Sequence, residues 1–168
     1  MQINKGVEWA VHACALLAPL PAGRGLSLAS LATFHGVPLP YMAKQMQLLS
    51  KAGIVRTRRG QSGGYALALA APDISLWDIK QAIEGAQPAF RCTEIRQRGP
   101  CAVPRKDCLK ACPIAAAFAK AERAFQDALA SVSLSEILVL TGEQSTPEHM
   151  GEIMGWYGPN ITILPGAP

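Results

Sequence analysis

Four of the five cysteines in this chain, Cys92, Cys101, Cys108 and Cys112, fall within one short segment. The segment reads CTEIRQRGPCAVPRKDCLKAC, and its two prolines, single glycine and many charges are typical of a loop. A long loop rich in thiols within a compact chain is usually functional. In a reducing compartment, clustered cysteines bind metal or take part in redox chemistry more often than they form structural disulfides. The loop is therefore the first candidate for a functional site.

Two further features could bring metal ligands to such a site. Cys108 and Cys112 lie directly before the helical sequence PIAAAFAKAERAFQDALASV, and a helix N-terminus favours thiolate formation. Glu8 and His12 are four residues apart, which places them on one face of a predicted helix. By itself, such a Glu–His pair is more often a solvated surface pair. Cys14, on the apolar face of the same helix, is interpreted as a packed core thiol.

Size and charge limit the classes of protein to which the chain can belong. Its 168 residues suit one domain, or one small domain with an extension, and nearly half of them are hydrophobic. The net charge of +4 permits a nucleic-acid partner without requiring one. Lys5, Glu8 and His12 interrupt the apolar N-terminal sequence, and no stretch reaches the roughly 18 apolar residues of a spanning helix. We expect a soluble cytoplasmic protein with no membrane partner.

Helical periodicity predicts three helices in the first third of the chain, over residues 3–18, 27–36 and about 39–51. The buried stripe predicted for the first helix comprises Ile3, Val7, Val11, Cys14 and Leu17. In the third helix, Met42, Met46 and Leu49 are expected to face the core. The side chains left outside are Tyr41, Lys44, Gln45, Gln47 and Lys51. Two short helices joined by a tight turn, the second with exposed polar side chains, are typical of a helix-turn-helix.

The sequence IVRTRRGQSGGYALALA, which follows, predicts two short strands around a glycine-rich turn. A hairpin that carries three arginines beside a candidate recognition helix is well suited to contact DNA phosphates or the minor groove. Together these elements predict a winged helix-turn-helix. The expected DNA contacts are Tyr41, Lys44, Gln45, Lys51, Arg56, Arg58, Arg59 and Gln61.

The remainder of the chain is predicted to be mainly helical. A helix over about residues 75–84 packs on the winged region, the cysteine loop follows, and a long helix over about 113–130 is interpreted as a dimerisation helix. A short helix comes next, and the Gly/Pro-rich sequence beyond about residue 141 shows no clear periodicity. We divide the chain into a DNA-binding domain (1–90), a cysteine loop with dimerisation helix (91–140) and a C-terminal tail of unknown role (141–168). The fold class expected is mainly α with a small β-hairpin.

These features together resemble the Rrf-two family of bacterial winged-helix transcription regulators, which includes the IscR, NsrR and RsrR types. The resemblance rests on the wing with GQSGGY, the thiol loop and the long helix after it, and covers about residues 1–140. The sequences most similar to the RsrR type are VEWAVH (7–12), YMAKQMQLLSKAGIVR (41–56), GGYAL (63–67), PAFRCTEIRQRGP (88–100) and KACPIA (110–115).

The resemblance to the RsrR type implies a dimer that holds a 2Fe-2S cluster near the subunit boundary. Its ligands are a Glu and a His from the first helix of one subunit and two loop cysteines of the other. Matched to this sequence, these are Glu8, His12, Cys108 and Cys112. Replacing thiolate by imidazole raises the reduction potential of a cluster, and a His ligand can couple proton uptake to electron uptake.

Other members of the family use three loop cysteines, so Cys92 and Cys101 are less favoured ligands, and a 4Fe-4S cluster is the less favoured cofactor. Cys101 departs from the RsrR-type pattern and leaves the ligand set open. The resemblance implies a cytoplasmic homodimeric regulator, expected to be a repressor, that binds a pseudo-palindromic double-stranded DNA operator. Its DNA affinity would follow the redox state or presence of the cluster.

Two alternatives remain open from the residues alone. One is a metal-free regulator in which the four loop cysteines form disulfides under oxidant. The other is a structural zinc site, held by the C-x-x-x-C pair and His12, in a protein–protein interaction module. An enzyme is not expected, and no small-molecule substrate is predicted, because no catalytic set or phosphate loop is present and GQSGG lacks the Walker lysine. His35, at the end of the second predicted helix, is interpreted as a surface residue.

Overall fold

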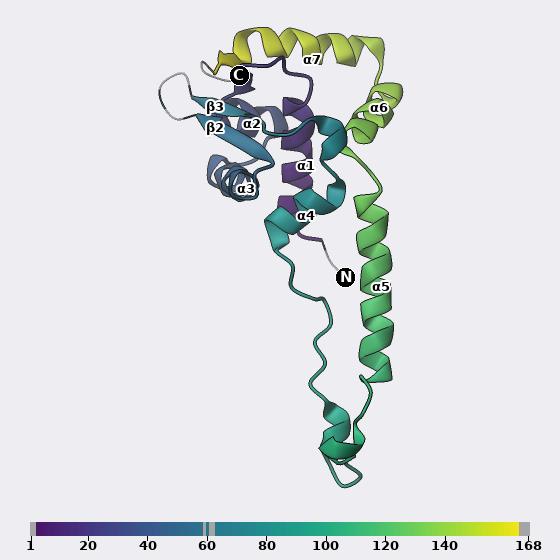
Figure 1. Cartoon of the computed structure of the whole chain (residues 1–168). Coiled ribbons are helices and arrows are strands. Elements are labelled where there is room, and N and C mark those ends of the chain that lie inside the picture. The colour runs from purple at the N-terminus through teal and green to yellow at the C-terminus, as the bar shows by residue number, and fades with distance from the viewer. Residues whose placement is uncertain (1–2, 59, 61–62, 165–168) are drawn as a thin grey trace.

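The computed structural model describes residues 3–58, 60 and 63–164. The described helices are α1 (Lys5–Leu17), α2 (Leu28–His35), α3 (Leu39–Lys51), α4 (Leu76–Glu84), α5 (Pro113–Ala130), α6 (Leu134–Gln144) and α7 (Pro147–Asn160). The described strands are β1 (Arg24–Leu26), β2 (Val55–Arg58), β3 (Gly64–Leu67) and β4 (Ile161–Ile163). Most of these elements form a compact body, from which α5 and residues 85–112 extend as a long arm (Figure 1).

Helix α1 lies at the centre of the body and contacts α2, α3, α4 and α6. The Asn4 side chain caps it by accepting a hydrogen bond from the Gly6 N–H at 2.6 Å. Its inward face is closely packed, and Ala10, Ala13 and Cys14 are fully buried. Because the helix begins after this cap, Ile3 lies outside it and is exposed, whereas the sequence pattern places it in the buried stripe.

The second and third helices follow the prediction closely. Ser27 caps α2, and Gly36 ends it in the left-handed conformation that favours glycine. Helix α3 begins and ends at the predicted residues, and Met42, Met46 and Leu49 are fully buried. These side chains bring α3 against both α1 and α2, which completes the helix-turn-helix.

The antiparallel sheet has the strand order β2-β3-β1-β4. The predicted wing hairpin is confirmed, with Arg58 paired to Gly64 beside its turn. The sequence pattern does not predict the three-residue strand β1, which joins the hairpin to β4. A Cβ atom at Gly25 of β1 would lie only 2.5 Å from the Tyr65 carbonyl oxygen, so this strand needs glycine there.

The segment beyond residue 141 is folded, although the sequence pattern assigns no element to it. Helix α7 lies across the top of the body, and β4 adds to the sheet (Figure 1). Tyr157 of α7 is buried, and its hydroxyl donates a hydrogen bond to the Leu16 carbonyl at 2.7 Å. Phe34 packs edge-on against Trp156 with ring centroids 4.7 Å apart. These contacts attach the C-terminal segment to α1 and α2.

The arm consists of α5 and the chain that descends beside it. Trp77 of α4 packs against Phe125, and the Phe90 and Phe118 rings stack 4.4 Å apart. The Ala89 N–H donates to Glu122 Oε1 at 2.9 Å. Helix α5 covers the predicted residues, and none of its side chains is fully buried. No helix among the described residues is long and apolar enough to span a membrane.

Candidate functional site

Helix α3 presents three of its predicted DNA-contacting side chains to solvent. Lys44 and Lys51 are exposed, and Tyr41 is 57% exposed. The Tyr41 ring also packs edge-on against Trp9 of α1, with centroids 5.8 Å apart. The exposed face of α3 is therefore in direct contact with the helix that carries Glu8 and His12.

Gln45 does not belong to this exposed face, so the prediction that its side chain lies outside the core is wrong. The side chain is only 5% exposed, and its Oε1 has no hydrogen-bond partner among the described residues. It lies against Gly6, where an added Cβ would approach Gln45 Oε1 to 2.8 Å. The absence of a side chain at Gly6 leaves the space that the buried amide occupies.

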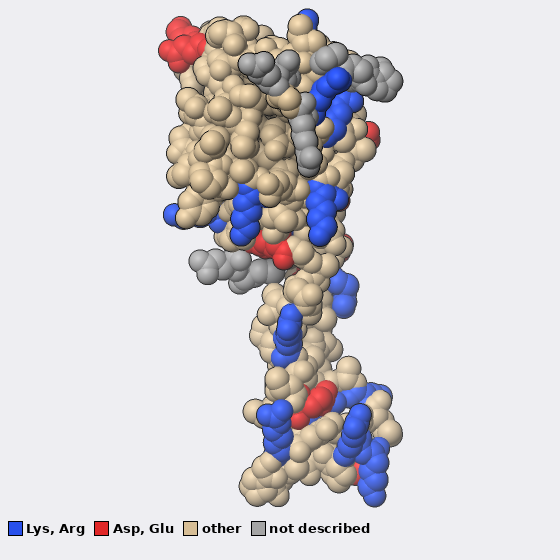
Figure 2. All heavy atoms as spheres, turned by 90° about the vertical axis from the view of Figure 1, so that its left-hand side faces the viewer, with Lys and Arg blue, Asp and Glu red and all other residues tan. Residues whose placement is uncertain are grey.

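The wing presents Arg58 to solvent at the end of β2. Arg56 is half-buried instead, and its Nε has no hydrogen-bond partner among the described residues. Arg59 and Gln61, which are also predicted to contact DNA, lie outside the described residues. Figure 2 shows Lys and Arg side chains at several points on the face with α3 and the wing, and again at the end of the arm.

Glu8 and His12 lie on α1, and both are exposed. The His12 ring is 5.5 Å from the ring of His35, which the sequence interpretation places on the surface. That interpretation is wrong in one respect, because His35 is half-buried and its Nε2 is enclosed without a partner among the described residues. Burial, with a smaller contribution from the charge of His12, lowers the pKa of His35.

The cysteine loop is irregular as predicted, with two short 3-10 turns at Ile95–Gln97 and Arg105–Asp107. Cys108 and Cys112 are half-buried, while Cys92 and Cys101 are exposed. Arg96 crosses the loop, because its Nη2 donates to the Lys110 carbonyl at 2.8 Å and its Nε to Glu94 Oε2 at 2.7 Å.

Cys112 occupies the N-cap position of α5. The backbone N–H groups of Ala115 and Ile114 lower the pKa of its thiol, with smaller contributions from the Cys92 thiol and the Arg96 charge. Cys14 contrasts with it, because complete burial raises the pKa of that thiol to about 12. The loop thus holds the thiol that ionises more readily, and the core holds the inert one.

The two halves of the predicted ligand set do not meet within one chain. Glu8 and His12 belong to the body, whereas the cysteine loop lies at the far end of α5 (Figure 1). Among the residues that the structure describes, no three His, Cys, Asp or Glu side chains lie together closely enough to hold a metal ion. If these residues form one site, a second chain must complete it.

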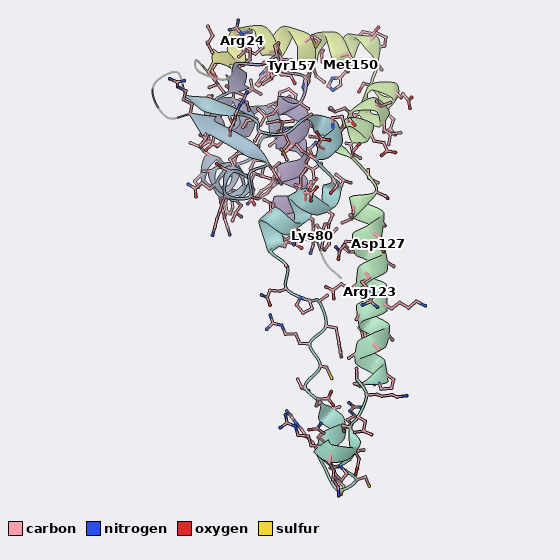
Figure 3. All side chains as sticks on the ribbon, in the orientation of Figure 1. Arg24, Lys80, Arg123, Asp127, Met150 and Tyr157 are labelled. Atoms are coloured by element: carbon pink, nitrogen blue, oxygen red, sulfur yellow. The ribbon has the colours of Figure 1, made fainter. Side chains whose placement is uncertain are left out.

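A cavity of about 220 Å³ lies between α1, α2, α6 and α7, and no pattern in the sequence indicates it. Met150 and Tyr157 line it from the side of α7 that faces the body (Figure 3). His12 and His35 are the imidazoles in a lining that is otherwise mostly apolar. The cavity depends on α7, which has no periodicity from which it could be predicted.

The chain matches the family model of Rrf2, described as an iron-dependent transcriptional regulator, over residues 3–139. The HTH-type transcriptional regulator YffB of Lactococcus lactis is 31% identical over 137 residues, which are 82% of this chain and 86% of that protein. Among the solved structures that share the fold of this chain, two have a TM-score of 0.64 each. One is T. potens IscR, at 24% identity over 90% of this chain and 96% of that chain.

The other is CymR, the global cysteine regulator of B. subtilis, at 20% identity over 83% of this chain and 98% of that chain. The predicted mainly α fold with a winged helix-turn-helix is confirmed. The family consists of transcription regulators, so the expectation that the chain is not an enzyme is also confirmed. The chain belongs to the Rrf2 (Rrf-two) family of transcription regulators.

Proposed function

We propose that this protein is a dimeric, cytoplasmic transcription regulator whose affinity for double-stranded DNA depends on an iron–sulfur cluster. Glu8 and His12 of one subunit and Cys108 and Cys112 of the partner subunit would hold a 2Fe-2S cluster. Regulators of the Rrf2 family bind DNA and act as dimers, which supports the coarser part of this proposal. The identity of the cluster and its ligands is the part that needs an experiment.

The arm is the single observation that carries the proposal. It places the cysteine loop at the end of α5, an 18-residue helix about 27 Å long, while Glu8 and His12 remain on the body. The apolar face of α5 is open to solvent, with Ile114 59% and Phe118 51% exposed. Packing this face against a second chain would bury apolar surface and carry each loop toward the other body.

The chemistry of the donor set fits an iron–sulfur cluster. Cys112 has a lowered thiol pKa at the N-terminus of α5, and Arg96 lies close enough to contribute to that shift. Glu8 and His12 are exposed on the same helix, four residues apart, so both are free to face a second subunit. Cys92 and Cys101 are also exposed, and both remain less favoured ligands.

The protein itself supplies a short path from the proposed ligands to the DNA-reading helix. Trp9 follows Glu8 on α1 and packs against Tyr41, and Gly6 packs against Gln45. When bound, the cluster would supply a one-electron change in charge between the subunits. A change in the position of α1 would reach α3 through these two contacts. DNA affinity then changes only if DNA distinguishes the two positions of α3.

The operator is proposed to be pseudo-palindromic, because a symmetric dimer presents two α3 helices to successive major grooves. Tyr41, Lys44 and Lys51 of α3 and Arg58 of the wing would contact bases and phosphates. Action as a repressor belongs to the same proposal, since a dimer bound over a promoter excludes other proteins from it.

Anaerobic purification followed by iron and sulfide assays and a visible spectrum tests the cofactor. About two irons and two sulfides per chain, with a spectrum that dithionite bleaches reversibly, are expected. About four irons per chain would shift the assignment to a three-cysteine site. A colourless protein would contradict the cluster. DNA affinity measured by fluorescence anisotropy with oxidised, reduced and cluster-free protein then tests control, which fails if all three states bind equally.

A metal-free thiol switch is the second candidate, and one observation favours it. Cys92 makes a small contribution to the lowered pKa of the Cys112 thiol, which indicates that the two side chains are near each other. Two thiols so placed could be joined by an oxidant. This candidate predicts a colourless protein whose DNA affinity changes with hydrogen peroxide and is restored by dithiothreitol. A colourless protein that retains zinc and lacks DNA affinity would favour the structural-zinc alternative instead.

A further inference from the structure

We propose that the surface formed by α6 and α7 is the docking site for the cysteine loop of a second copy of this chain, and that Leu109 of the partner subunit enters the cavity beside His12. This inference rests on the proposed function only in that both require a dimer. It adds a surface that would seat the loop, whether or not the loop holds metal.

The cysteine loop and the surface formed by α6 and α7 carry opposite charges. Residues 91–112 of the loop carry four arginines and two lysines against one glutamate and one aspartate, a net charge of +4. Helices α6 and α7 contain no Lys or Arg, and their acidic side chains are all exposed. These side chains are Glu136, Glu143, Glu148 and Glu152. Such opposite charges attract the two surfaces and orient them as they meet.

The loop and the cavity each leave apolar surface exposed to solvent. Leu109 is 88% exposed in the loop, although a leucine gains free energy from burial. The cavity between α1, α2, α6 and α7 has a mostly apolar lining, and Met154 at its edge is 61% exposed. A cavity of about 220 Å³ is large enough for a leucine side chain. An apolar side chain at the centre of a charged rim is a common arrangement for a protein interface.

The positions of Leu109 and His12 also favour this docking. Leu109 lies between Cys108 and Cys112, and His12 lines the cavity. Docking of Leu109 would therefore bring both thiols of the partner subunit to the part of α1 that carries His12. The proposed docking site therefore lies beside the proposed ligand His12. The features that define the docking site are an apolar cavity and carboxylates, not metal donors.

Helix α7, which supplies part of this surface, lies beyond the part of the chain that matches the Rrf2 family model. The match to the Rrf2 family model ends at residue 139, before α7 begins at Pro147. Three of the residues that line the cavity, Met150, Ile153 and Met154, belong to α7. The C-terminal segment would thus take part in the contact between the two subunits.

Site-specific photocross-linking tests the proposal directly. Benzoylphenylalanine is placed at position 109 of the full chain, and the purified dimer is irradiated with and without metal. Mixing isotopically light and heavy chains identifies cross-links between subunits by mass spectrometry. Cross-links from position 109 to residues 138–157 of the other chain are expected, with a yield that falls as salt increases. The same probe at Leu69, an exposed leucine on the body, is the control and should not reach that segment.

A matched pair of glycine variants tests the cavity. Added Cβ atoms at Gly142 and Gly155 meet nothing within 4 Å, so both helices accept a side chain there. Gly142 lines the cavity and Gly155 does not. Gly142→Phe should fill the cavity and lower the cross-linking yield by about tenfold, the effect expected when the side chain at position 109 can no longer enter the cavity. Gly155→Phe should leave the yield unchanged.

The outcomes separate this inference from the proposed function. Absence of inter-subunit cross-links from position 109 to α6 and α7, or equal yields in the two glycine variants, overturns the docking site. Iron content and the visible spectrum of the same preparations judge the cluster independently. A coloured protein without these cross-links keeps the proposed function and loses the inference. A colourless protein with them keeps the docking site and loses the cluster.

Discussion

Tyr157 is the residue that fixes the C-terminal segment to the centre of the body. Its hydroxyl donates to the Leu16 carbonyl at 2.7 Å, and burial raises the pKa of its phenol from 10.0 to about 12. The folded state therefore keeps the proton to a higher pH than the unfolded state. The stability linked to this raised pKa is fully present below pH 10 and is lost as the pH rises toward 12, because the buried phenol must then ionise.

Tyr157→Phe should lower the free energy of unfolding by about 1 kcal/mol near neutral pH, because the Leu16 carbonyl loses its donor. The difference between the variant and the wild type should narrow as the pH rises above 10, since only the wild type has a phenol to deprotonate. Guanidinium denaturation of both proteins below and above pH 10 measures this. A gap that widens with pH would contradict the assignment.

Gly6 and Gln45 show how one missing side chain determines the packing between two helices. An added Cβ at Gly6 would lie 2.8 Å from both Asn4 Oδ1 and Gln45 Oε1. Gly6→Ala should therefore destabilise the protein by about 1–3 kcal/mol and weaken DNA binding through displacement of α3. Denaturation and operator titration measure the two effects.

Gly155→Ala is the matched control for Gly6→Ala, because it is also a helical glycine but its Cβ meets open space and it does not line the cavity. This variant should stabilise the protein by up to about 1 kcal/mol through helix propensity and leave DNA affinity unchanged. Equal effects of the two alanines would show that the contact between Gly6 and Gln45 is unimportant.

At the scale of elements, α3 and α5 could be predicted to the residue. Their apolar residues recur at helical spacing, Pro40 and Pro113 favour the first turn, and glycine follows α3. The short strands β1 and β4 could not be predicted from the sequence, because each has only three residues and depends on pairing with neighbouring strands of the sheet. Helix α7 has no clear helical periodicity because it contains three glycines and two prolines, and tertiary contacts such as those of Tyr157 stabilise it.

For the candidate site, the sequence identifies most of the residues but not their arrangement in space. Residue types and the family resemblance identify Glu8, His12 and the loop cysteines, and the structure exposes the first two and separates them from the loop. The predicted exposure of Gln45 is wrong because a polar side chain is expected at the surface, although this one shares the helix face of Met42 and Leu49. Only the packing of Gly6 against α3 reveals the space in which the amide is buried.

The exposed basic side chains of α3 and β2 should bind DNA phosphates. Lys44→Ala and Arg58→Ala should each lower affinity and reduce the slope of log K against log salt by about 0.9 for each phosphate that the native side chain neutralises. Arg123→Ala, on the arm, should leave the slope unchanged. Titrations of operator DNA over a range of salt concentrations measure this. Unchanged slopes for Lys44→Ala and Arg58→Ala would show that α3 and the wing do not bind phosphates.

In the whole molecule, the body and the arm each expose surfaces that the other part of a second copy could cover. The body carries the reading helix, the exposed Glu8 and His12, an apolar cavity and an acidic surface. The arm carries exposed apolar residues on α5 and a basic loop with four cysteines. Each part presents surfaces that a second copy of the other would satisfy. The shape of the chain therefore supports a dimer in which ligands, charges and apolar contacts are exchanged between subunits.

The measurement that tests this account most directly is subunit complementation. Chains with His12→Ala and chains with Cys112→Ala are purified anaerobically, first alone and then as mixed dimers isolated with two different affinity tags. Each variant alone should lack the cluster, because every site in its dimer is missing a ligand. The mixed dimer should regain about half of the wild-type iron and absorbance, since one of its two sites has all four ligands.

The opposite result is equally clear. In a site built within a single chain, neither chain of the mixed dimer would have a complete ligand set. A mixed dimer without iron would therefore contradict the exchange of ligands between subunits. Full iron content in either variant alone would contradict the assignment of His12 or Cys112 as a ligand.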